Sequence, residues 1–322
     1  MVSRSRPSLK FFLLLGFVIL FLVMGFESSV RAMGESTCQS SFGPIPTELP
    51  DWLLPATDKA NLQTDYRYDL LSARLLSSGF VSAPDCSFNG LNPDGSVNAC
   101  GLEKALKQVR TWQNEYDPAI LSASSSGRVP PKIVKAVIAV ESQFWPGADW
   151  TRGEIGLGQM TTNGADLVLT WQPGYYQQIC SQIYGSSTCS TGYRFLDPAA
   201  QRVLQGAVLK SIDPTCASCP GGLDKTKGNL AVQSLVETIN ASCQQSSRLI
   251  YLAMGKSPAL VLSYEDYWRV VLANYHAGAG CVYQALLRDK SAKSWPAISA
   301  NFPAGCASGR EYIRRIEEQI KP

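Results

Sequence analysis

The chain has 322 residues, of which 45% are hydrophobic and 17% charged. Its net charge of +3 arises within residues 1–32, so the rest of the chain is close to neutral and carries no basic footprint for nucleic acid. The chain contains a single histidine, which excludes HExxH metallohydrolases and most catalytic triads.

Residues 1–32 are predicted to direct export. Arg4, Arg6 and Lys10 precede an uninterrupted apolar run over residues 11–26, and a small-residue cleavage site ends at Ala32. The run of 16 residues is short for the roughly 20 that span a bilayer. We therefore expect a cleaved signal peptide, with a retained N-terminal anchor as the alternative. The protein is expected outside the cell or in the envelope, in the periplasm or cell wall, and this segment is the only membrane contact that we expect.

Residues 33–126 are predicted to form a small helical N-terminal region followed by a linker. Helical spacing of apolar residues predicts helices over residues 58–76 and 102–116, and turn-forming residues dominate 89–101. The serine-rich run over 122–127 predicts the linker. Residues 127–322 then form the larger domain.

All ten cysteines follow residue 32, and an even number in an exported chain favours disulfides. Three precede the predicted linker and seven follow it, so complete pairing requires a bridge between the two regions. Cys86 and Cys100 are the expected local pair because the loop between them closes at low entropic cost, which leaves Cys38 to cross. Cys216 and Cys219 form a CxxC motif without two further zinc ligands at matching spacing, so we expect a structural bridge there and no metal.

The stretch over residues 130–160 contains the candidate acid. Two prolines suit the first turn of a helix, and Val134, Val137, Ile138 and Glu141 then recur at offsets that place them on one face. A carboxyl group among aliphatic side chains resists ionisation, so its pKa should rise and it can act as a general acid. The alternative is a structural carboxylate at the edge of the apolar stripe, or one paired with an arginine such as Arg152.

A glycine-rich return follows this helix. Pro146 is expected to end the helix, and Gly153, Gly156 and Gly158 then bracket a tight turn that leads to Met160. Glycines at such positions let the backbone come close to a ligand.

These motifs resemble a known family. Glu141-Ser142 followed by Gly156-Leu157-Gly158-Gln159 resembles the ES…GLMQ signature of the soluble lytic transglycosylase (SLT) domain. Residues 275–278, YHAG, are similar to its YNAG motif, residues 197–209 resemble its DP-containing helix, and residues 310–316 resemble its closing helix. The resemblance covers residues 129–316. It departs where Gly158 replaces Met, where His276 replaces Asn, and where residues 211–263 exceed the usual length.

The resemblance implies a mainly α, lysozyme-like catalytic domain over residues 127–322, in a disulfide-rich protein. Strand-like alternation is scarce, in agreement with this class. The insertion over residues 216–247 is predicted to hold a disulfide loop and one helix, and separate helices are predicted over 248–254 and 264–277.

The resemblance also implies an activity, which is the cleavage of peptidoglycan glycan strands without a cofactor. Glu141 would protonate the oxygen between N-acetylmuramic acid and N-acetylglucosamine, and the muramyl C6 hydroxyl would attack internally to give a 1,6-anhydro end. The substrate-binding residues implied by the motifs are Ser142, which supports the acid, and Gln159, Met160, Tyr275, His276 and Tyr312.

Two other functions remain open from the sequence. A hydrolase similar to goose-type lysozyme would share the acid and the glycine-rich turn, and would use Asp149 or Glu154 to position a water. A non-catalytic peptidoglycan-binding module is the third interpretation. The presence of Glu141 argues against it, because a buried unpaired acid costs stability.

Overall fold

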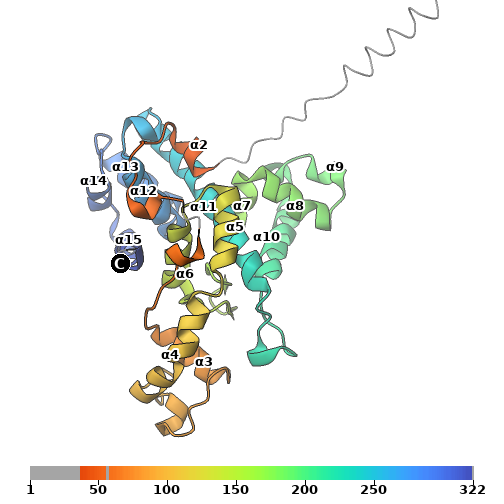
Figure 1. Ribbon diagram of the computed structural model, residues 1–322. Coiled ribbons are helices and arrows are strands. Elements are labelled where there is room, and N and C mark those ends of the chain that lie inside the picture. Colours follow the sequence, from red (N-terminus) through yellow and green to blue (C-terminus); the bar gives the residue numbers. More distant parts are fainter. Residues whose placement is uncertain (1–36, 56–57, 321–322) are drawn as a thin grey trace, which may run out of the picture. The chain divides into compact units, whose positions relative to one another are not determined.

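Helices dominate the computed structural model, which describes residues 37–55 and 58–320 (Figure 1). The helices are α2 (Cys38–Phe42), α3 (Asp69–Ser77), α4 (Ala99–Gln113), α5 (Asp117–Gly127), α6 (Pro131–Ser142), α7 (Thr162–Trp171), α8 (Pro173–Ile183), α9 (Ser186–Cys189), α10 (Pro198–Ile212), α11 (Lys227–Met254), α12 (Tyr264–Ala277), α13 (Ala279–Arg288), α14 (Trp295–Ala300) and α15 (Ala307–Ile320). Strands β1 (Ala148–Asp149) and β2 (Glu154–Ile155) form a short antiparallel pair. The prediction of a mainly α, disulfide-rich protein is confirmed. The predicted export segment lies outside the described residues.

The 28-residue helix α11 is the central packing element. It contacts α2, α5, α7, α10, α12 and α13, and positions such as Val232 and Ile239 are fully buried. The prediction of a separate helix over residues 248–254 is wrong, because α11 continues through residues 240–247. The helix predicted over residues 264–277 is confirmed as α12. Two of the buried hydroxyl groups of α11 are satisfied within the helix, since those of Thr238 and Ser242 donate to the carbonyl groups of Ser234 and Thr238 at 2.7 and 3.0 Å. No helix of the described ranges is long and apolar enough to cross a membrane.

The N-terminal region differs from the prediction of one helix over residues 58–76. A 3-10 turn covers Lys59–Asn61, and α3 begins only at Asp69. The chain between them is extended because its backbone pairs with side-chain amides of α4 and its C-cap. The side-chain amide of Asn114 exchanges two hydrogen bonds with the backbone of Thr64. The side-chain amide of Gln113 does the same with the backbone of Tyr66, and all four bonds are 2.9 to 3.1 Å long. These tertiary bonds override the helical spacing.

The predicted linker over residues 122–127 is the second half of helix α5. The helix packs against α6 and α11, and it ends where Gly127 meets α11. The Gly127 carbonyl accepts from the Asn240 amide at 3.0 Å, and a Cβ at position 127 would lie only 2.3 Å from a methyl of Val236. Close packing therefore orders a serine-rich segment whose composition alone favours a loop.

The disulfides confirm the pairing argument. Cys86 bonds Cys100 within the N-terminal region, and Cys38 crosses to Cys243 on α11. Cys38 is fixed further by its backbone N–H, which donates to Asn240 Oδ1 at 3.1 Å. The remaining bridges are Cys180–Cys189, Cys216–Cys219 and Cys281–Cys306.

Candidate functional site

Helix α6 positions the candidate acid in its last turn. Its residues Val134, Val137 and Ile138 are fully buried, as the spacing predicts, and Glu141 follows on the same face. The helix ends at Ser142, earlier than the predicted stop at Pro146, because the next two residues are left-handed, Gln143 at φ 47° and Phe144 at φ 65°.

Contacts with the N-terminal region hold this unusual chain reversal. The Gln143 side chain accepts from the backbone N–H groups of Leu70 and Leu71 at the start of α3, at 2.9 and 3.3 Å. The Trp112 indole of α4 donates to the Phe144 carbonyl at 2.9 Å. Left-handed conformations of such residues cost roughly 1–3 kcal/mol each and persist only where surrounding contacts enforce them. The N-terminal region is therefore part of the structure that aims Glu141.

The glycine-rich return closes as a tight hairpin beside the acid. Ile155 and Met160 exchange backbone hydrogen bonds at 2.9 and 3.0 Å, and Gly156 supplies the required positive φ of 74°. Ser142 Oγ donates to the Leu157 carbonyl at 2.8 Å, which ties this loop to the end of α6. From the opposite side, the Tyr275 hydroxyl donates to the Gly158 carbonyl at 2.7 Å.

Gly158 is closely packed in this arrangement. A Cβ there would lie 3.0 Å from both the Tyr275 hydroxyl and a methyl of Leu235. Any larger side chain must displace one of these neighbours, so Gly158 and the position of Tyr275 depend on each other.

The electrostatic environment of Glu141 favours its protonated form. Its side chain is 16% exposed, and burial raises its pKa from 4.5 to about 7. The Tyr312 hydroxyl group and the charge of Arg315 lower this pKa, whereas the charge of Glu154 raises it. Near neutral pH the carboxyl group can thus hold a proton and release it.

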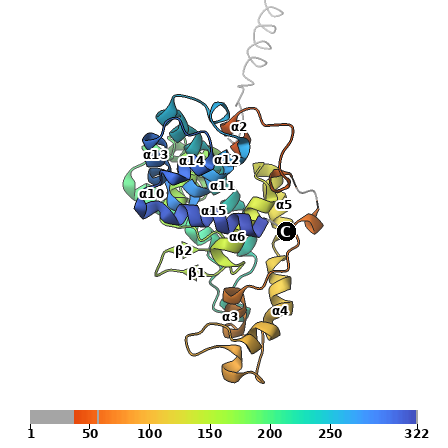
Figure 2. The ribbon, with the colours of Figure 1, turned by 90° about the vertical axis from the view of Figure 1, so that its left-hand side faces the viewer.

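Helices α12 and α15 complete the surroundings of the acid. His276 in the last turn of α12 lies with Nδ1 4.0 Å from Glu141 Oε1, and its ring stacks on Tyr312 at 4.2 Å and 9°. Burial and the charge of Arg315 lower the pKa of His276. Arg315 donates to the Val140 carbonyl at 3.0 Å, where α15 runs alongside α6 (Figure 2).

A cavity of about 860 Å³ opens on one side of Glu141. Among the predicted site residues, Gln159, Met160, Tyr275 and His276 line it together with the acid. The other two lie behind its wall, where Ser142 supports the loop and Tyr312 supports the His276 ring. Its volume suits sugar rings.

Several cavity residues were not predicted, because no motif marks them. Thr238 and Gln245 come from α11, whose apolar spacing indicates only a core helix. Trp171 at the end of α7 and Arg194 lie in the same cavity, and the guanidinium stacks over the indole at 4.7 Å. For the residues of α11, the one sequence signal is a polar residue within an apolar stripe, such as Thr238.

A smaller hollow of about 90 Å³ lies on the other side of Glu141. Its walls include Trp145 and the α3 residues Leu70 and Arg74. Glu141 and Gln159 line both hollows, so the acid stands where they meet.

The alternative carboxylates Asp149 and Glu154 lie on either side of the acid, in the small hollow and the large cavity respectively. Arg152 pairs with both, at 2.8 and 3.2 Å. The ion pairs of Arg152 are therefore with these two residues, and not with Glu141 as one alternative from the sequence had it. Hydrogen bonds from Thr151 and Arg152 lower the pKa of Asp149 to about 2.

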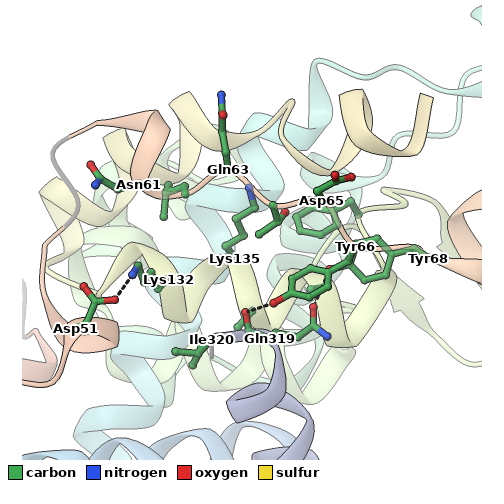
Figure 3. Close-up of a pocket in the computed structure, with 15 residues that line it drawn as sticks. Asp51, Asn61, Gln63, Asp65, Tyr66, Tyr68, Lys132, Lys135, Gln319 and Ile320 are labelled. Carbon is green, nitrogen blue, oxygen red and sulfur yellow. Dashed lines mark hydrogen bonds and ion pairs between the residues drawn. The ribbon is translucent and has the colours of Figure 1, made fainter. Parts of the chain in front are cut away.

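A third hollow, of about 350 Å³, lies apart from these two (Figure 3). It is lined by Lys132 and Lys135 on the face of α6 roughly opposite Glu141, by residues 61–66 and by the end of α15. Lys132 pairs with Asp51, and the buried Lys135 pairs with the buried Asp117 at 2.7 Å. These lysines are therefore already neutralised, and none of the predicted site residues lies here.

Within the ranges that the structure describes, no three His, Cys, Asp or Glu side chains are grouped to hold a metal ion. Comparisons of the chain with known protein families, curated proteins and solved structures give no match.

Proposed function

We propose that the protein is a lytic transglycosylase with a lysozyme-like helical domain, and that it cleaves the MurNAc-β-1,4-GlcNAc bond of peptidoglycan. The observation that carries the proposal is the position of Glu141. It is a largely buried carboxyl with a pKa of about 7, in the wall of a cavity of about 860 Å³ whose volume suits sugar rings, at the point where a smaller hollow adjoins this cavity.

In this mechanism Glu141 acts first as acid and then as base. Its proton goes to the glycosidic oxygen as the bond to muramyl C1 breaks, and the muramyl C6 hydroxyl attacks C1. The carboxylate takes up the hydroxyl proton, which restores the acid and leaves a 1,6-anhydro end. A pKa near the working pH suits both transfers. Gln159 and Tyr275, with Met160 and His276, contact the sugars, and Ser142 and Tyr312 hold the wall behind them.

Hydrolysis by a muramidase is the second candidate, and the position of Glu154 favours it. Its charge contributes to the raised pKa of Glu141, so the two carboxyl groups interact across the site. A water-activating base must hold a water opposite the acid. The ion pair between Glu154 and Arg152 opposes this role, because it engages the carboxylate elsewhere.

The products of digestion distinguish these candidates. Purified peptidoglycan is digested with the wild type, Glu141→Gln and Glu154→Gln, and the fragments are analysed by mass spectrometry with and without borohydride. We expect fragments one water lighter than hydrolysis products, with muramyl ends that borohydride does not reduce. Glu141→Gln should lower the rate by roughly 10²–10⁴-fold.

The controls separate the remaining alternatives. Reducing muramyl ends, together with a comparable loss in Glu154→Gln, would identify a muramidase instead. Binding of peptidoglycan without any cleavage by the wild type would identify a non-catalytic module. Export to the envelope, which the proposed substrate requires, is tested by fractionating cells that produce the full chain. The disulfides are compatible with such an oxidising compartment.

A further inference from the structure

The smaller hollow of about 90 Å³ beside Glu141, which α3 helps to line, contains a cation without a partner. Arg74 lines it one helical turn after Leu70, and its guanidinium has no ion pair or side-chain hydrogen bond to any residue in 37–55 or 58–320. The other arginine of the hollow, Arg152, is neutralised by Asp149 and Glu154. Of the residues that line the hollow, Arg74 and Arg152 are cations and Asp149 is an anion, whereas Glu154 lines the larger cavity. Since Glu141 is largely uncharged below pH 7, the lining then carries one net positive charge.

Two parts of the wall of the hollow, Trp145 and the start of α3, are held in place by neighbouring residues. Trp145 stacks on Trp112 of α4 with centroids 5.8 Å apart and meets the edge of Phe80 at 6.4 Å. The start of α3 is fixed by its hydrogen bonds to Gln143. Leu70 remains 45% exposed and adds an apolar surface beside Arg74. An anion that enters therefore meets a guanidinium on an ordered helix.

Size and chemistry indicate what this hollow binds. At about 90 Å³ it accommodates a group of a few heavy atoms, whereas the sugar rings fit the cavity of about 860 Å³. The guanidinium fork matches the two oxygens of a carboxylate. Muramyl residues carry a lactyl group, which ends in a carboxylate or continues into a peptide with carboxylates of its own.

We propose that the smaller hollow beside Glu141 binds a carboxylate that the substrate carries next to the cleaved bond, and that Arg74 is the residue that recognises this carboxylate. This inference rests on the proposed function and assigns a specificity role to the N-terminal region. The carboxylate belongs either to the lactyl group itself or to a stem peptide.

The test compares three substrates. The first is glycan strands freed of peptide by an amidase, which carry lactyl carboxylates. The second is the same strands with those carboxylates converted to methylamides, and the third is strands with intact stem peptides. Wild type, Arg74→Gln and the control Arg67→Gln are assayed on each. Arg67 is on the same segment but pairs with Glu103 at 2.8 Å and does not line the hollow.

We expect Arg74→Gln to lower kcat/KM by about 10- to 100-fold on a carboxylate-bearing substrate, through KM, as for a hydrogen bond to a charged group. On methylamide strands it should equal the wild type, and Arg67→Gln should equal the wild type throughout. A loss on the amidase-treated strands assigns the lactyl carboxylate, and a loss restricted to the intact strands assigns the peptide.

An equal loss on all three substrates, or no loss on any, would overturn the proposal. It would also be overturned if Arg194→Gln, in the larger cavity, produced the carboxylate-dependent loss while Arg74→Gln did not. Binding is measured in parallel by co-sedimentation with the strands, with Glu141→Gln as the background for Arg74→Gln. Failure of the wild type to cleave any strand refutes the proposed function, whereas unchanged, carboxylate-independent binding refutes the role of Arg74.

Discussion

The raised pKa of Glu141 predicts that Glu141→Gln stabilises the protein, and that it does so only at higher pH. A shift from 4.5 to about 7 corresponds to about 3 kcal/mol. Below pH 4.5 the carboxyl is protonated in both the folded and the unfolded chain, so burial carries no ionisation cost. Between pH 4.5 and 7 only the unfolded chain loses the proton, so the free energy of unfolding falls as pH rises. Glutamine cannot ionise and removes this loss.

The measurement is thermal and denaturant unfolding of both forms from pH 4 to pH 8. The stability difference between Glu141→Gln and wild type should grow by about 3 kcal/mol over this range, with most of the change between pH 4.5 and 7. Gly206→Ala is a suitable control because position 206 is open and the substitution removes no titratable group. A difference that stays constant with pH, or that grows as pH falls, would refute the raised pKa.

The activity itself should follow the same protonation, with kcat/KM falling about tenfold per pH unit above pH 7 as the acid loses its proton; an alkaline limb centred near pH 4.5 would contradict this. Removal of the Cys38–Cys243 bridge by double serine substitution should lower stability by roughly 2–5 kcal/mol, measured by denaturant unfolding, and non-reducing peptide mapping should find this pair. A free Cys38 thiol would refute the pairing. Gly158→Ala should displace the Tyr275 hydroxyl and lower the rate of glycan cleavage, whereas the helical Gly206→Ala should be neutral or stabilising by about 1 kcal/mol; equal activity of the two variants would show that the close contact at position 158 has no effect.

Local sequence patterns predict a structural feature when the residues that form it are close in the chain, or when the number of cysteines restricts how they can pair. The apolar spacing of α6 predicts both the helix and the face that carries Glu141, because helical periodicity alone places residues three, four and seven apart together. The crossing disulfide of Cys38 follows from the odd number of cysteines before the predicted linker and from the cheap closure of Cys86 with Cys100. The Cys86–Cys100 bond can be predicted without knowledge of the fold.

Tertiary contacts decided the remaining features. Residues 64–66 are extended because Gln113 and Asn114 bond their backbone, and the serine-rich residues 122–127 are helical because α5 packs on α11. Local propensity amounts to fractions of a kcal/mol per residue, so a few buried contacts outweigh it.

The properties of the candidate site follow the same division. The sequence placed Glu141 among apolar neighbours within its own helix, and thereby predicted the direction of its pKa shift. The value of about 7 also depends on Tyr312, Glu154 and Arg315, two of which lie more than 170 residues away along the chain. Arg74 enters the site because α3 packs on α4 and because Gln143 accepts hydrogen bonds from the first turn of α3. Electrostatic interactions depend on distance in space, and only the fold determines those distances.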